Sequence, residues 1–104
     1  MLSSMKNYEI ANVNATLNEL VDEPLKGKFK FKLFKIKATL EGKMEVIVKA
    51  LEGVEDEKER TEILNEEQEV TVDKLSHEEL ENIDLSIRQI SMLQPIIEEG
   101  TDES

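Results

Sequence analysis

The stretch that decides the fold covers residues 28–54 and reads KFKFKLFKIKATLEGKMEVIVKALEGV. Its apolar residues recur at steps of three and four, which places them on one stripe of an α-helix about seven turns long. That stripe is made of Phe29, Leu33, Ile36, Leu40, Met44, Ile47, Leu51 and Val54. Residues 28–33 alone alternate as a strand does, but the alternation fails at Phe34 while the helical stepping continues. We therefore interpret residues 28–54 as one helix, with a core seam formed by Phe29, Leu33, Ile36, Leu40, Ile47 and Leu51.

A shorter helix is predicted ahead of this one, from Tyr8 to near Asp22. Its apolar residues follow the same helical spacing and are Ile10, Val13, Leu17, Leu20 and Val21. We expect Asn7 to cap its amino end, and Pro24 to end it, because proline disfavours helical geometry in the residue before it. Since the link to the next helix is short, the two helices should pair as an antiparallel hairpin.

The C-terminal part of the chain is predicted to hold a small β-hairpin and a last helix. Residues 68–73 alternate and include β-branched residues, which favours a strand, and residues 83–85 are its expected partner. Two motifs with the spacing of a capping box, at residues 76–79 and 86–89, predict one helical turn and the start of the last helix. The apolar side of that helix would hold Ile87, Ile90, Leu93 and Ile97. Pro95 should either kink it or begin a new first turn.

Together these elements predict an α+β fold, with an antiparallel helical hairpin, a short β-hairpin and a C-terminal helix. A length of 104 residues suits one domain. We expect a flexible N-terminus over residues 1–6, a single domain over residues 7–99 and a disordered tail over residues 100–104. Residues 55–69 should be a solvated acidic connection with one helical turn near Ile63.

The charge of the chain is negative and unevenly distributed. Asp and Glu number 24 against 13 Lys and Arg, which gives a net charge of −11 and disfavours general binding to nucleic-acid phosphates. Residues 1–37 carry +3, whereas residues 38–104 carry −14. The chain has no cysteine, no apolar run near the roughly 20 residues of a membrane span, and no signal-peptide stretch at its start. We therefore expect a cytoplasmic location without membrane contact.

The sequence offers no residue pattern typical of an enzyme. An active site needs a nucleophile with a base, paired acids in a pocket, or metal ligands at usable spacing, and none of these patterns is found. The single histidine, His77, lies in an acidic capped turn and is expected to be exposed. The four glycines are scattered, and the acidic stretch lacks the glycine of a calcium-binding loop. We predict no catalytic residues, no metal site and no cofactor.

Two surfaces are candidates for contact with a partner. Six lysines interleave with three phenylalanines between Lys26 and Lys37. Phe31 and Phe34 lie roughly 140 to 200° around the helix from Phe29, so they should face away from the core seam. The acidic stretch is the second surface. The predicted partner-binding residues are Phe31, Phe34, Lys30, Lys35, Glu59, Glu62, Glu66 and Glu67.

The long apolar seam also predicts a homodimer. Its eight residues exceed what the five-residue stripe of the first helix can cover, and burying the excess against a second copy would be favourable.

If residues 28–34 were instead a strand, Phe31 and Phe34 would belong to the core.

The order of these segments resembles a family of short, uncharacterised proteins encoded by tailed phages and prophages of Gram-positive bacteria. The resemblance covers about residues 5–99. It is carried by NYEI at residues 7–10, the helix at residues 29–40, EVTV at residues 69–72 and LQPIIE at residues 93–98. The second helix departs from that family in being rich in Lys and Phe rather than Ala, and the middle of the chain is shorter. The resemblance implies an accessory protein of phage infection and brings no catalytic residues.

Three functions follow as hypotheses. The first is a non-enzymatic phage accessory protein that binds and modulates or inhibits a host or phage protein, such as a component of a defence system. The second is an acidic DNA mimic that blocks a nucleic-acid-binding protein. The third is binding of single-stranded nucleic acid through the Lys/Phe-rich segment, which the net charge disfavours.

Overall fold

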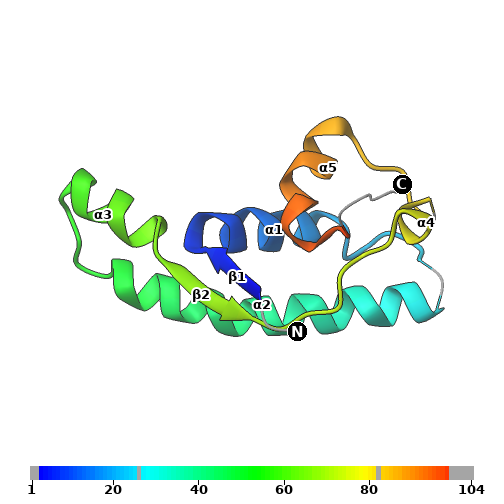
Figure 1. The fold of residues 1–104 in the computed structure, drawn as a ribbon, viewed down its shortest axis with the longest axis horizontal. Helices are drawn as coiled ribbons and strands as arrows, with labels where there is room; N and C mark the ends of the chain where they lie inside the picture. The colour runs from blue at the N-terminus through cyan, green and yellow to red at the C-terminus, as the bar shows by residue number, and fades with distance from the viewer. Residues whose placement is uncertain (1–2, 26, 82, 99–104) are drawn as a thin grey trace.

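The computed structural model describes residues 3–25, 27–81 and 83–98, and Figure 1 shows the resulting fold. In chain order the elements are β1 (Ser3–Lys6), α1 (Asn7–Glu19), α2 (Gly27–Leu51), α3 (Glu57–Leu64), β2 (Glu67–Val70), α4 (His77–Leu80), α5 (Ile87–Leu93) and the 3-10 turn η1 (Gln94–Ile96). The α+β class is confirmed. The tail expected over residues 100–104 lies outside the described residues.

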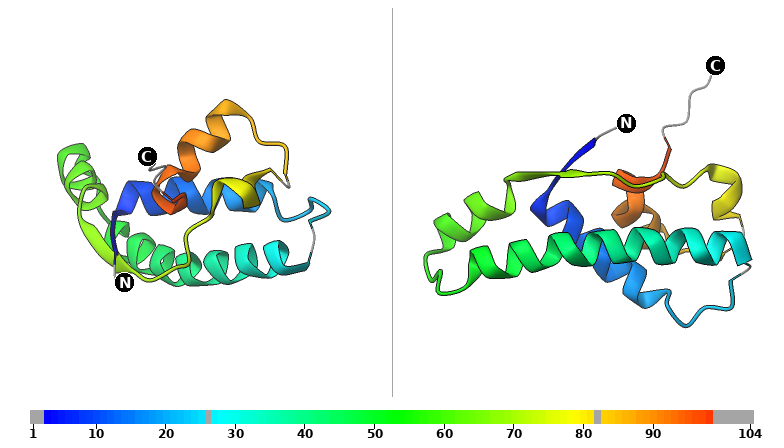
Figure 2. Two further views of the ribbon diagram at one scale, coloured as in Figure 1. Left: turned by 45° about the vertical axis from the view of Figure 1, so that its right-hand side comes forward. Right: turned by 90° about the horizontal axis from the view of Figure 1, so that it is seen from below.

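Helices α1 and α2 form the predicted antiparallel hairpin. Residues 28–34 are helical, so the strand alternative is wrong for them. Helix α2 runs the length of the molecule, and α1 crosses it obliquely (Figure 2). Both helices end about three residues earlier than expected. After α2, Gly53 adopts a left-handed conformation with φ of 75°, which an L-residue with a side chain adopts only at a cost.

The amino end of α1 differs from the prediction. Strand β1 runs directly into the helix, so Lys6 is the extended residue before it, and its N–H donates to Glu9 Oε1 at 2.9 Å. Asn7 is the first helical residue and is buried. Its side chain therefore does not cap the helix and is free to contact other segments, as described below.

The sheet pairs different segments from those expected. Strands β1 and β2 are antiparallel, with Ser3 opposite Val70 and Lys6 opposite Glu67. The prediction that residues 83–85 would pair with the strand is wrong, and residues 3–6, expected to be flexible, form β1. The reason is burial over a long sequence separation, because Met5 and Val70 both lie in the core.

The core is built mainly from the seam of α2 and from α1. Of the predicted seam, Phe29, Leu33, Ile36, Leu40 and Ile47 are buried, while Leu51 is half-buried against the same cluster. Helix α1 covers the middle of α2, and α3 and β2 pack towards its C-terminal end. On its other side α1 contacts α5 and η1, so it lies between α2 and the C-terminal segment (Figures 1 and 2). The apolar seam is thus covered within one chain, which removes the reason that led us to expect a homodimer.

The last helix buries less than predicted. Both capping boxes are present: Glu79 N–H donates to Ser76 Oγ, and Gln89 N–H to Ser86 Oγ, each at 3.1 Å. Ile87, expected on the apolar side, is 84% exposed, whereas Leu93 of the same helix is buried. Pro95 lies at the start of η1, the new first turn that was one of two expectations.

One extended stretch, residues 67–75, connects with both ends of the described chain. Its first four residues pair with β1. At its other end Leu75 N–H donates to Ile96 O at 2.7 Å, and Glu98 N–H donates to Leu75 O at 2.8 Å. Leu75, Ile96 and Ile97 are buried, so this second contact also closes the core.

Candidate functional site: an apolar groove bordered by lysines

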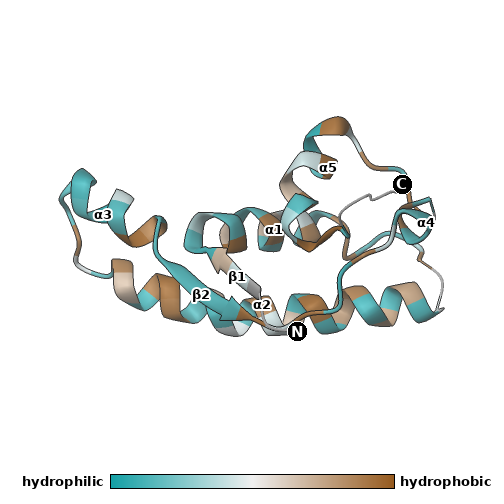
Figure 3. Ribbon diagram, in the orientation of Figure 1, coloured by the Kyte–Doolittle hydropathy of each residue, from teal (hydrophilic) through white to brown (hydrophobic). Residues whose placement is uncertain are grey.

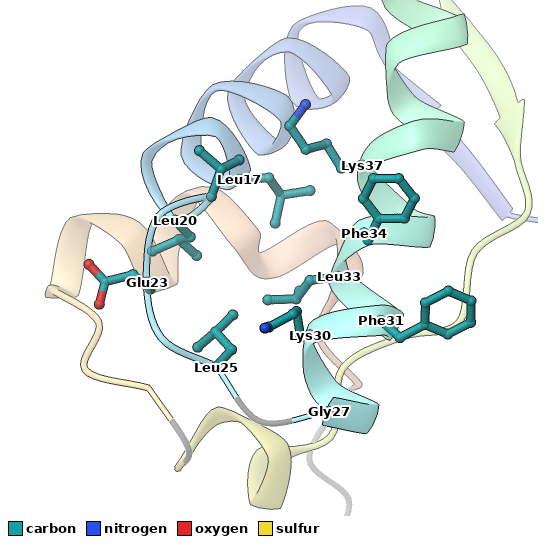
Figure 4. Close-up of a pocket in the computed structure, with 11 residues that line it drawn as sticks. Leu17, Leu20, Glu23, Leu25, Gly27, Lys30, Phe31, Leu33, Phe34 and Lys37 are labelled. Atoms are coloured by element: carbon teal, nitrogen blue, oxygen red, sulfur yellow. The ribbon is translucent and has the colours of Figure 1, made fainter.

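A groove of about 510 Å³ lies between α1 and α2. Figure 4 shows it at the C-terminal end of α1 and the first three turns of α2. We call it the α1–α2 groove. Its lining residues come from α1, from the link that follows it and from α2, and are Leu17, Leu20, Val21, Glu23, Leu25, Gly27, Lys30, Phe31, Leu33, Phe34 and Lys37.

The groove exists because α1 ends before its apolar residues do. The helix stops at Glu19, and the chain continues through a non-helical link before α2 begins at Gly27. Leu20 in this link is buried and Leu25 is half-buried, so the link is held against the core rather than projecting into solvent. The link therefore forms one wall of the groove, and the leucine side chains of this wall face α2 (Figure 4).

Helix α2 supplies the other wall through its periodicity. At 100° per residue, Leu33 lies on the groove side of the core seam, Lys30 and Lys37 lie next around the helix, and Phe34 follows. Exposure rises in the same order, from buried Leu33 to Phe34, which is 65% exposed. Phe31 continues the wall outward and is 61% exposed. Lys30 and Leu33 point from α2 toward Leu20 and Leu25, whereas the rings of Phe31 and Phe34 point to the outer side of α2 (Figure 4).

Lysines border this apolar surface. Lys30 and Lys37 line the groove, and Lys35 Nζ lies 5.3 Å from the centroid of the Phe31 ring, within the range of a cation–π contact. Lys37 pairs with Glu41 on the same helix. Among the described residues Lys30 has no ion pair. The α2 wall of the groove is therefore electropositive, although the molecule as a whole is strongly acidic.

Lys28 and Lys30 lie at the helix end where positive charge is least favourable. The first turn of α2 contains Lys28 and no acidic residue. The helix dipole places a partial positive charge at that end, which favours Asp and Glu there and disfavours Lys. The helix dipole therefore gives no reason for a lysine at position 28 or 30.

The structure separates the predicted partner-binding residues into two groups. Lys30, Phe31 and Phe34 line the α1–α2 groove, and Lys35 lies beside it. The acidic members are exposed but lie near α3, at the opposite end of the long axis of the molecule (Figure 1). They are Glu59, Glu62, Glu66 and Glu67. No single contact surface can therefore include both groups.

The acidic end is exposed throughout. Residues 55–69 contain eight acidic and two basic residues, a net charge of −6, and all eight acids are exposed. Helix α3 buries none of its residues and is eight residues long, where one turn was expected. Its start is marked by Asp56, whose side chain accepts a hydrogen bond from Glu59 N–H at 3.3 Å. Figure 3 shows the hydrophilic character of most of α3 and β2.

The described residues were also searched for metal sites and membrane-spanning helices. His77 is exposed. No group of three or more His, Cys, Asp or Glu side chains among residues 3–25, 27–81 and 83–98 could hold a metal ion. In that part of the chain no helix has the length and apolar character needed to cross a membrane.

The aliphatic wall of the groove was missed in the sequence. Leu17 and Leu20 were assigned to the contact between the two helices, and Val21 to the same stripe. In the structure Val21 and Leu25 face the groove, beyond the end of α1. The signal present was Leu25, an apolar residue directly after Pro24.

Comparison of the chain with models of known protein families, with curated proteins and with solved structures finds no match.

Proposed function

We propose that this protein is a non-enzymatic binding protein that takes part of another protein into the α1–α2 groove and thereby modulates or inhibits it. The observation that carries the proposal is the exposure of Phe31 and Phe34 on the wall of that groove. Large exposed aromatic side chains grouped beside an apolar groove are typical of interaction sites, where aromatic residues supply much of the binding energy.

The setting we propose is phage infection of a Gram-positive bacterium, on the basis of the resemblance described above. The partner would be a host or phage protein in the bacterial cytoplasm. If the protein is an inhibitor, a component of a host defence system is a suitable target. This setting rests on the resemblance alone, whereas the binding role rests on the groove.

Capture from the lysate of phage-infected cells tests the binding role. Three forms of the immobilised protein are compared: the wild type, the double variant Phe31→Ser with Phe34→Ser, and the control Ile87→Ser. Ile87 is the more exposed residue and lies outside the groove lining, so it controls for the loss of a surface apolar side chain. We expect a protein recovered by the wild type and the control but not by the double variant. Equal recovery by all three forms would overturn the proposal.

A second candidate function uses the acidic end. The eight exposed acids of residues 55–69 support an acidic mimic of DNA that blocks a nucleic-acid-binding protein. A variant that neutralises Glu59, Glu62, Glu66 and Glu67 to Gln separates the two candidates. Loss of the captured partner in this variant, with the Phe31/Phe34 variant retaining it, would favour the mimic. Binding through the mimic should also be abolished by high salt.

We still propose a homodimer, but through a surface other than the core seam. Since the seam is covered within the chain, a dimer would have to use exposed apolar residues such as Val46 and Val48 of α2. Sedimentation velocity over a range of concentrations tests it, and a monomer at high micromolar concentration would refute it.

A further inference from the structure

We infer that the partner segment bound in the α1–α2 groove is a short amphipathic helix with acidic flanks, whose apolar side chains enter the groove and whose carboxylates face the lysines of α2. This inference rests on the proposed function, because it specifies the occupant of the same site.

The dimensions of the groove suit a helix of about three turns. On α2 it extends from Gly27 to Lys37. These eleven residues span about 15 Å along the axis of α2, which is close to the length of a bound helix of about three turns. A helix bound in this way places side chains at positions i, i+3 or i+4, and i+7 into the groove. Leu20 and Leu25 on one side and Phe34 on the other would receive them.

Charge selects the polar face of this helix. Lys30 is exposed on the groove wall without an ion pair among the described residues, and Lys35 lies at its edge. Acidic residues flanking the apolar side chains would lie close to these lysines and to the amino end of α2. They would supply the negative charge that the first turn of α2 lacks. The lysines disfavoured by the dipole of α2 therefore have a use in binding.

The walls favour an apolar peptide over a single-stranded nucleic acid. Bases bind by stacking on accessible aromatic faces. Here one face of Phe31 is approached by Lys35, and the wall across the groove from α2 consists of leucine and valine side chains with Glu23, none of which offers a stacking surface. The net charge of −11 further opposes a polyanion, whereas a short segment with a few carboxylates interacts chiefly with the local lysines.

Selection from a random-peptide display library tests the inference, because it requires no assumption about which protein the partner is. The wild-type protein is the target, and the Phe34→Ser variant is the counter-target, so that retained peptides depend on the groove. The consensus peptide is then labelled, and its binding is measured by fluorescence anisotropy at about 50 and about 500 mM salt. A single-stranded oligothymidylate is the nucleic-acid probe.

We expect retained peptides to be acidic, with apolar residues at i, i+3 or i+4, and i+7, and to bind several-fold more weakly at high salt. Lys30→Glu should weaken the consensus peptide at least tenfold, whereas Lys58→Glu, the same change in the first turn of α3, should leave it unchanged. Enrichment of basic peptides or of peptides without this periodicity, no enrichment over the counter-target, or tighter binding of the oligonucleotide would each overturn the inference. The proposed function would survive those results if capture of a cellular protein still depended on Phe31 and Phe34.

Discussion

The side-chain amide of Gln68 donates a hydrogen bond to Oδ1 of Asn7 at 2.8 Å, although 61 positions separate the two residues in the sequence. Asn7 in turn donates from Nδ2 to Ile63 O at 2.7 Å, and its backbone N–H donates to Glu66 O at 2.8 Å. Gln68 also donates to Lys43 O of α2 at 3.3 Å. Asn7 therefore joins the start of α1 to the end of α3, and Gln68 extends this network to α2.

Replacing Asn7 should destabilise the fold. Asn7→Ala removes two side-chain hydrogen bonds and leaves the Ile63 carbonyl without this donor in a partly buried site, for which we expect a loss of about 1 to 3 kcal/mol. The free energy of unfolding from urea denaturation measures it. Asn18→Ala, an exposed position on the same helix, should change stability by less than about 0.5 kcal/mol. Equal effects of the two variants would show that the network contributes nothing.

Neighbouring positions on α2 should separate stability from binding. Ile36 is 2% exposed, and Ile36→Ala should cost about 2 to 5 kcal/mol because truncation leaves a cavity in the core. Phe34→Ala should change the free energy of unfolding by no more than about 0.5 kcal/mol and yet weaken partner binding. Thermal denaturation with a parallel binding assay checks both. A Phe34 variant that melts as early as the Ile36 variant would identify that ring as a core residue.

Charge reversal at the amino end of α2 should raise stability while it lowers affinity. Glu in place of Lys30 interacts favourably with the helix dipole, for which we expect a gain of up to about 1 kcal/mol. The same variant loses a lysine of the groove wall. Lys58→Glu in α3 is the control for charge reversal and should leave binding unchanged, but it should not raise stability, because it adds a carboxylate beside Glu57, Glu59 and Glu62. A Lys30→Glu variant that keeps full affinity for the partner would contradict a role for this charge.

The ion pair between α2 and α4 should make stability depend on pH. Lys32 Nζ lies 2.8 Å from Glu79 Oε1, and this hydrogen bond, with a second from Ser76 N–H, holds the pKa of Glu79 below its ordinary value. A lowered pKa in the folded state stabilises the protein above the ordinary carboxyl pKa, and this contribution disappears as the pH falls through the lowered value.

Glu79→Gln tests this dependence because glutamine can keep the capping box but not the charge. We expect the variant to be less stable than the wild type near pH 7, and the difference to shrink as the pH falls below about 4. Denaturant titrations at a series of pH values measure the difference. Glu78→Gln, an exposed neighbour, should show no comparable change. A difference that stays constant with pH would refute the assignment.

Two glycines near the C-terminal half of α2 should respond oppositely to alanine. Gly42 lies within the helix, and an added Cβ would meet no atom within 4 Å, so Gly42→Ala should stabilise by about 0.5 to 1 kcal/mol. Gly53 has a φ of 75°, so Gly53→Ala should destabilise by about 1 kcal/mol or more. Melting temperatures of the two variants give the signs directly. Two changes of the same sign would show that backbone conformation does not decide the effect.

Local patterns predicted the two long helices and the capping boxes near the C-terminus, although the cap expected at Asn7 is wrong. The three-four stepping of α2 extends over enough turns to override the alternation of residues 28–33, and the capping boxes at Ser76 and Ser86 formed as their spacing indicated. Each of these features depends on residues a few positions apart. The lysines and phenylalanines of the groove could be recognised for the same reason, since they share one helix.

Contacts between distant segments could not be predicted in this way. Residues 3–6 contain no alternation of branched apolar residues, and β1 becomes a strand because Met5 enters the core beside β2. The aliphatic wall of the groove was missed because it depends on how the non-periodic link after α1 is held against α2. Ile87 was misplaced for a related reason, since the face that α5 turns to α1 depends on contacts between distant segments, such as the hydrogen bond from Gln89 to Glu19.

The extended stretch at residues 67–75 also has a consequence for the order of synthesis. Strand β1 leaves the ribosome first, but its partner β2 follows only about sixty residues later, and Leu75 finds its own partner only after Ile96 and Glu98 have been made. The helical hairpin can form from local contacts while the chain is still growing, whereas the core closes last. Until then Met5, Val70 and Leu75 are exposed on the nascent chain, and this interval is when it is most open to chaperones and proteases.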